Sequence, residues 1–191
     1  MSLLGRVSSV PLTDTNGAVI GRGASIDINA PGNVVITATP TASTPGVISL
    51  NAQTLSSWNA ESLIIGGKRT RDATGTTLTV TSTNITVNNA GTTLTAPDLT
   101  LAATNGITVS AGGQISSSGT LNGDAETLRL SGNGSLIRVS QSESAAVMRS
   151  GVTNATGPSL TIGANAQISG GSLTLDSTST ATTLASSALL N

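Results

Sequence analysis

The chain has 191 residues and a net charge of −1, and Gly, Ser, Thr and Asn supply 94 of its residues. The absence of His and Cys excludes the commonest zinc, copper and haem ligands, as well as Ser-His-Asp and Cys-His catalysis and any disulfide framework. A single Trp and eight scattered basic residues provide neither base stacking nor a basic surface for nucleic-acid binding.

The rest of the composition predicts an ordered, all-β protein. Leu, Ile and Val together make up 45 residues, and the net charge is near zero, which is not typical of disordered chains. Thr and the β-branched aliphatic residues favour strands, Gly and Asn favour turns, and Ser, Thr, Asn and Gly are poor helix formers. We expect no cofactor and no metal ion.

The amino-terminal part shows no targeting segment and a first sign of repetition. Residues 1–6 lack the features of a signal peptide, and the longest aliphatic run, 63–65, is too short to span a membrane. The motif Ile26-Asp27-Ile28 recurs 22 residues later as Ile48-Ser49-Leu50, and Leu55 follows as a further strand position. Residues 39–46 are expected to form an enlarged turn.

A clearer repeat relates residues 78–98 to residues 99–119, with a period of 21 to 22 residues. Apolar and other residues alternate in short triplets, which is typical of strands with one buried face. The matched positions are Leu78-Thr79-Val80 with Leu99-Thr100-Leu101, Ile85-Thr86-Val87 with Ile107-Thr108-Val109, and Leu94 with Ile115.

The same pattern returns near the carboxyl terminus in Leu160-Thr161-Ile162, Ile168 and Leu173-Thr174-Leu175. Residues 140–157 lack it. An antiparallel meander has no reason to repeat every third strand, whereas a parallel β-helix, a solenoid of stacked coils, does. We therefore predict one β-helix over residues 1–191, with about three short strands per coil of about 21 residues. Loop excursions are expected at 39–46, 66–76 and 140–157, and Thr and Asn faces form the predicted contact surface.

Four residues are candidates for ligand contact. Lys68, Arg69 and Arg71 could bind an anionic ligand such as a sulfated glycan or a lipid head group, or they could form a solvated turn beside Asp72. Trp58 could stack on a sugar or fill an irregular coil.

An enzyme is the weaker alternative. Glycosidases need two carboxylates across a cleft, and Asp98 could lie one coil away from Asp124 and Glu126. Nine acids over the chain produce such neighbours by chance, so we predict no catalytic residues and no enzymatic activity.

Several motifs resemble the β-helical part of filamentous haemagglutinin-like exoproteins over about residues 24–185. They are the stretch from Ala60 to Arg69, Ile85-Thr86-Val87-Asn88-Asn89, the stretch from Leu94 to Ala102, the stretch from Gly134 to Ser140, the stretch from Leu160 to Ala164, and the stretch from Gly170 to Asp176.

The resemblance implies an internal or carboxy-terminal segment of a large Gram-negative surface protein, secreted through a dedicated outer-membrane transporter. It implies a right-handed β-helical fibre at the cell surface that serves adhesion, biofilm formation or contact-dependent interaction. The partner would be a host or bacterial surface glycan or protein, with no nucleic acid and no membrane span. A carbohydrate-active β-helix enzyme and a phage tail-fibre or spike segment remain the alternatives.

Overall fold

The structure is a computed structural model that describes residues 12–39, 41, 44–73, 75–153, 156–179 and 182–191. This part of the chain forms 19 β-strands in four sheets and one short helix, which confirms the all-β prediction. The predicted absence of a signal peptide at residues 1–6 concerns residues outside the described part. Positions 40, 42–43, 74 and 154–155 of the predicted excursions also lie outside the described part.

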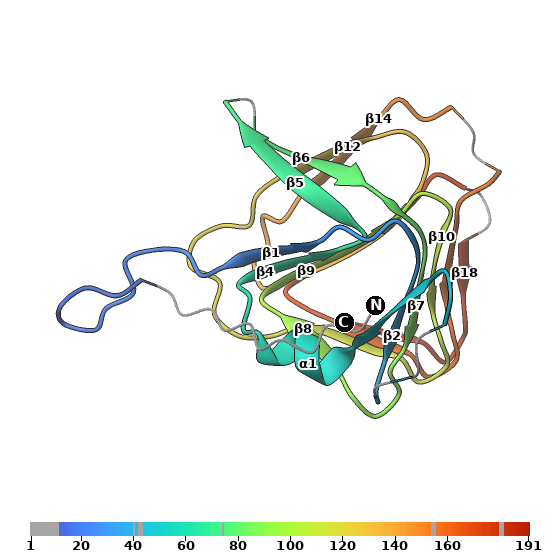
Figure 1. The fold of residues 1–191 in the computed structure, drawn as a ribbon, viewed down its shortest axis with the longest axis horizontal. Coiled ribbons are helices and arrows are strands. Elements are labelled where there is room, and N and C mark those ends of the chain that lie inside the picture. The colour runs from blue at the N-terminus through green and yellow to red at the C-terminus, as the bar shows by residue number, and fades with distance from the viewer. Residues whose placement is uncertain (1–11, 40, 42–43, 74, 154–155, 180–181) are drawn as a thin grey trace.

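Three sheets surround the main core, as the view in Figure 1 shows. The five-stranded sheet has the order β1 (Ser25–Ile28), β4 (Ser62–Ile65), β9 (Asp98–Ala103), β13 (Ser135–Ser140) and β17 (Ser172–Ser177). The six-stranded sheet has the order β18 (Thr182–Leu184), β15 (Ser159–Ile162), β10 (Gly106–Val109), β7 (Ser82–Asn88), β2 (Gly32–Thr37) and β3 (Val47–Asn51). The third sheet has the order β19 (Leu189–Leu190), β16 (Gln167–Ser169), β11 (Gln114–Ser117) and β8 (Leu94–Ala96).

A fourth sheet, here called the outer sheet, lies against the far side of the five-stranded sheet (Figure 1). Between the two sheets lies a second, smaller core that includes Ile64, Leu128 and Leu136. Its strands have the order β14 (Val147–Ser150), β12 (Leu128–Ser131), β6 (Gly75–Val80) and β5 (Gly67–Asp72).

The prediction of a single right-handed parallel β-helix is wrong. Two of the four sheets are mixed, because β13 runs antiparallel to both β9 and β17, and β5 runs antiparallel to β6. Parallel stacking at the predicted period does occur locally, since Ile107 pairs with Ile85 and Ile115 pairs with Leu94. The six-stranded sheet and the β8–β19 sheet are parallel throughout their described pairings.

Two connections between the five-stranded sheet and the outer sheet pass through glycine turns. Gly66 joins β4 to β5 with a φ of +97°, and Gly132 and Gly134 join β12 to β13 with φ of +82° and +156°. These φ values lie in a region of backbone conformation that residues other than glycine rarely adopt. The chain returns from the outer sheet in the opposite direction, so β13 becomes antiparallel to its neighbours.

The predicted excursions take these positions in the structure. Residues 66–76 contain β5 and the start of β6, and residues 140–157 contain β14. Residues 39–46 lie between β2 and β3.

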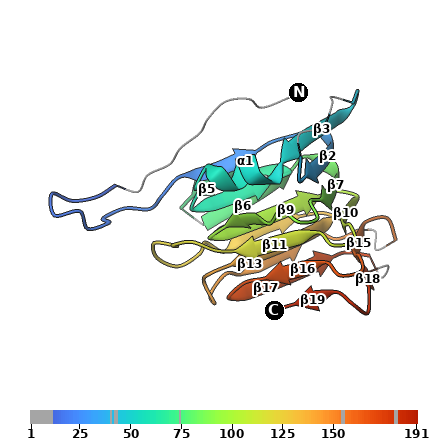
Figure 2. The same ribbon diagram turned by 90° about the horizontal axis from the view of Figure 1, so that it is seen from below.

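The predicted strand at Leu55 is instead part of helix α1 (Ala52–Ser57). The side chain of Asn51 caps the helix by accepting a hydrogen bond from the Thr54 N–H at 2.8 Å. Leu55 is 2% exposed and packs into the main core. The helix therefore covers one end of that core, where Figure 2 shows it next to β3.

The opposite end of the stack is formed by β17, β18 and β19 (Figure 2). Each is the last strand of its sheet, and their residues are half-buried or exposed. Within the described residues, no helix is long and apolar enough to cross a membrane.

Candidate functional site

The predicted basic patch lies on β5, where alternation of the side chains divides it. The Arg69 side chain is only 5% exposed, and its Nε lies 2.6 Å from Asp27 Oδ1. The Arg71 side chain is 47% exposed and donates through Nε to Glu126 Oε1 at 2.7 Å. Lys68 is exposed and belongs to the other face of the strand. The structure therefore does not unite the three cations in one contact surface.

Trp58, the fourth candidate, does not lie on that strand. It follows α1, is 3% exposed and belongs to the main core. A sugar cannot stack on a ring buried to this extent.

Two of the three carboxylates considered for glycoside hydrolysis, Asp98 and Glu126, border the same hollow, whose volume is about 10 Å³, and Asp124 is not among the residues that line it. That volume holds about one water molecule and no sugar. Both oxygens of Asp98 accept hydrogen bonds from Arg138, at 2.9 and 3.1 Å.

Glu126 is held as an anion. Burial acts to raise its pKa, but hydrogen bonds from Arg71 and Thr76 and the charges of Arg71 and Arg22 outweigh burial, so the pKa lies below its ordinary value. A glycosidase acid needs a raised pKa to donate a proton near neutral pH. Glu126 therefore lacks the property of a general acid.

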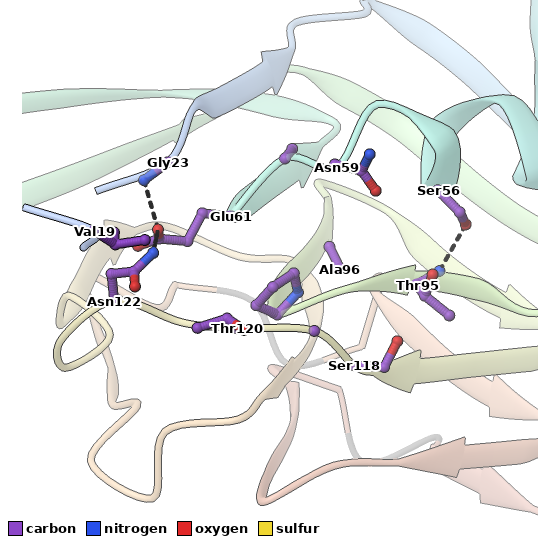
Figure 3. Close-up of a pocket in the computed structure, with 13 residues that line it drawn as sticks. Val19, Gly23, Ser56, Asn59, Glu61, Thr95, Ala96, Ser118, Thr120 and Asn122 are labelled. Atoms are coloured by element: carbon purple, nitrogen blue, oxygen red, sulfur yellow. Dashed lines mark hydrogen bonds between the residues drawn. The ribbon is translucent and has the colours of Figure 1, made fainter. Parts of the chain in front are cut away.

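A larger pocket of about 370 Å³ opens where the amino-terminal hairpin, closed by an antiparallel bridge between Thr13 and Val19, meets the body of the protein (Figure 3). Glu61 lies at the edge of this pocket and is 5% exposed. Its Oε2 accepts hydrogen bonds from the Gly23 N–H at 2.5 Å and from Asn122 Nδ2 at 2.8 Å. Arg22 Nε lies 3.7 Å from Glu61 Oε1. Glu61 thus joins the base of the hairpin to the 118–127 loop, which is a structural role.

The exposed side of the six-stranded sheet carries an ordered array of uncharged polar groups, here called the Thr–Asn face. Four threonines occupy equivalent positions on four successive strands, where neighbouring strands are about 4.8 Å apart. The threonines are Thr86, Thr108, Thr161 and Thr183, each paired in register with the next.

Three asparagines extend the Thr–Asn face at one edge. Asn84 Nδ2 donates to Asn33 Oδ1 at 2.9 Å, and Asn105 Nδ2 donates to Asn84 Oδ1 at 2.8 Å. A shallow groove of about 340 Å³ runs across β2, β7 and β10 on this face, and no charged residue lines it. The face therefore presents repeated hydrogen-bond donors and acceptors without net charge.

Sequence reasoning predicted Thr and Asn faces but did not identify these residues as a surface. For Thr86, Thr108 and Thr161, the central position in an Ile-Thr-Val or Leu-Thr-Ile triplet is the signal, since the apolar neighbours are buried in the core. Thr183 has no such triplet around it. Asn84 and Asn105 are 21 residues apart, at the repeat period. Asn33, Asn122 and Glu61 carried no comparable signal, because their partners lie at unrelated separations.

Among the described residues, no group of three or more His, Cys, Asp or Glu side chains could hold a metal ion. No protein-family model, curated protein or solved structure matches the chain.

Proposed function

We propose that the chain is a structural and adhesive segment of a secreted bacterial surface fibre, and that the Thr–Asn face is its contact surface. The observation that carries the proposal is the in-register alignment of Thr86, Thr108, Thr161 and Thr183 on one sheet. Fixed hydroxyl groups at a regular spacing suit a polymer that itself presents hydroxyl groups at intervals. The proposed partner is a neutral surface glycan.

The charge distribution supports a neutral partner over a sulfated one. The groove on this face is lined by amides, hydroxyls and short aliphatic side chains. Arg69 and Arg71, two of the three cations considered for an anionic ligand, are engaged by Asp27 and Glu126. Surface location, and export of the parent protein through an outer-membrane transporter, belong to the same proposal.

The test is binding to an array of neutral and sulfated glycans by the purified chain and two matched variants. Thr86→Val with Thr108→Val removes two hydroxyls from the face while keeping β-branched shapes. Thr77→Val with Thr79→Val makes the same change on exposed positions of β6 in the outer sheet. Two lost hydrogen bonds correspond to about tenfold weaker binding.

We expect the first variant to lose binding to neutral glycans and the second to retain it. An array without hits would overturn adhesion by this chain. Binding to sulfated glycans alone, abolished by Lys68→Gln, would assign the contact to β5 instead. A stable trimer in sedimentation velocity would favour the phage-spike alternative.

A further inference from the structure

The two ends of the strand stack differ in how their sheet edges are covered. At one end α1 lies against β8, and Ser56 Oγ accepts a hydrogen bond from the Thr95 N–H of that edge strand at 2.9 Å. At the other end β17, β18 and β19 are all edge strands (Figure 2). Along the described chain, no helix covers them. Three strand edges from three different sheets are therefore open at one end.

The main core extends to this end without being closed there. Leu173, Leu175, Ala188 and Leu190 pack against the core while remaining partly exposed. Leu184 and Leu189 are each 50% exposed. At the helical end, by contrast, Leu55 is 2% exposed. Apolar surface adjoining a core is removed from water most effectively by another apolar surface.

The longest of the open edges, β17, is the one best suited to pair with another strand, because it is six residues long and contains neither Lys nor Pro. β18 and β19 also lack Lys and Pro, but they are only three and two residues long. Asp176 is the one charged residue of the three strands, and its Oδ2 lies 2.7 Å from Arg149 Nε of the same chain. Two such ends can therefore approach each other without bringing together uncompensated charges.

We propose that this open end binds the open end of a second copy of the chain. An extended peptide could pair with one of the three edges, and the other two would stay open. A second copy presents the same three edges and the same apolar residues, so a two-fold symmetric contact covers them together. This inference does not rest on the proposed adhesive function, although the two surfaces meet at β18, which carries Thr183 of the Thr–Asn face.

The first test is sedimentation velocity of the full chain at increasing concentration, combined with hydrogen exchange. We expect a monomer–dimer equilibrium and slower amide exchange in β17, β18 and β19 as concentration rises. Leu184→Lys with Leu189→Lys should weaken dimerisation by at least about tenfold. Leu189→Lys alone provides a milder variant, and circular dichroism verifies folding of each protein.

Two control variants place lysine at other exposed apolar positions. Ile20, in the amino-terminal hairpin, is 61% exposed, and Met148, in β14, is 57% exposed. Ile20→Lys and Met148→Lys should leave the dimer intact. A chain that is monomeric at every concentration, or a dimer weakened equally by Ile20→Lys, would overturn the proposal. Concentration-dependent protection outside β17–β19 would do the same, and this measurement on the unmodified chain needs no variant to fold.

Discussion

Arg138 and Asp98 form a bidentate ion pair across two antiparallel strands, β13 and β9, and both are nearly fully buried. Arg138 also donates to the Ala146 carbonyl at 2.8 Å, and Asp98 accepts from Ser62 Oγ at 2.9 Å. The pair thus connects the five-stranded sheet to the segment that leads into β14. The pair lies where β13 runs antiparallel to β9, whereas all neighbouring strands of a parallel β-helix run in the same direction.

Removing one member of this pair should be strongly destabilising. Arg138→Met leaves the Asp98 carboxylate buried without its counter-charge, and we expect a loss of about 3–5 kcal/mol in the free energy of unfolding by urea denaturation. Adding Asp98→Asn should recover part of the loss. Arg71→Met, at a half-exposed pair, is the control and should cost about 1 kcal/mol or less. Equal losses in the two arginine variants would contradict the prediction.

The Glu126 carboxylate should make stability depend on pH. Its folded-state pKa lies below the ordinary value of 4.5, so its contribution is fully present above that value. The contribution is lost as pH falls through the lowered pKa, because the folded state then binds the proton too. We expect Glu126→Gln to be less stable than the unmodified chain at pH 7, and the difference to shrink toward acid pH. The measurement is thermal unfolding of both proteins over a pH series, and a constant difference would contradict the assignment.

The turn at Gly66 should tolerate no side chain. A Cβ there would lie 2.0 Å from the Ala102 carbonyl oxygen and 2.8 Å from Ile85 Cδ1. Gly91 has a comparable φ of +77° but nothing within 4 Å, which makes it a matched control. Gly91→Ala should cost about 1–2 kcal/mol from backbone strain alone, and Gly66→Ala clearly more. Similar urea-denaturation midpoints for the two variants would show that the backbone relaxes at Gly66.

The hydroxyl of Ser56 should protect the covered edge of β8. Ser56→Ala removes the acceptor of the Thr95 N–H, with an expected cost of about 0.5–1.5 kcal/mol and faster exchange of that amide. Ser57→Ala is the control, since its hydroxyl bonds only within α1, to the Thr54 carbonyl at 2.7 Å. Unchanged Thr95 exchange in Ser56→Ala would mean that the helix backbone alone shields the edge.

The alternation of residues predicted strands but could not assign them to sheets. Ile107 stacks on Ile85 as the repeat requires. Leu78, aligned with Leu99 in the sequence, instead lies in the outer sheet and the second core. Leu78 and Leu99 both belong to strands in which apolar and other residues alternate. That alternation shows that a strand has a buried face, but it does not show which of the two cores the face joins or in which direction the strand runs.

The candidate sites could be predicted only in part, because the sequence does not show which residues from different strands lie next to each other. Basic residues close in sequence suggested a patch at Lys68, Arg69 and Arg71, yet adjacent strand residues point to opposite faces. The Asp98–Arg138 pair spans 40 residues and depends on the reversed direction of β13. Only a fold with the correct strand directions could have brought it together.

The five-stranded sheet contributes one face to the main core and the other to the second core. In β9 and β13 every residue is buried. Detaching the outer sheet would expose the face of the five-stranded sheet that packs into the second core. Because β4, β9 and β13 contribute side chains to both cores, we expect the two cores to unfold together rather than separately.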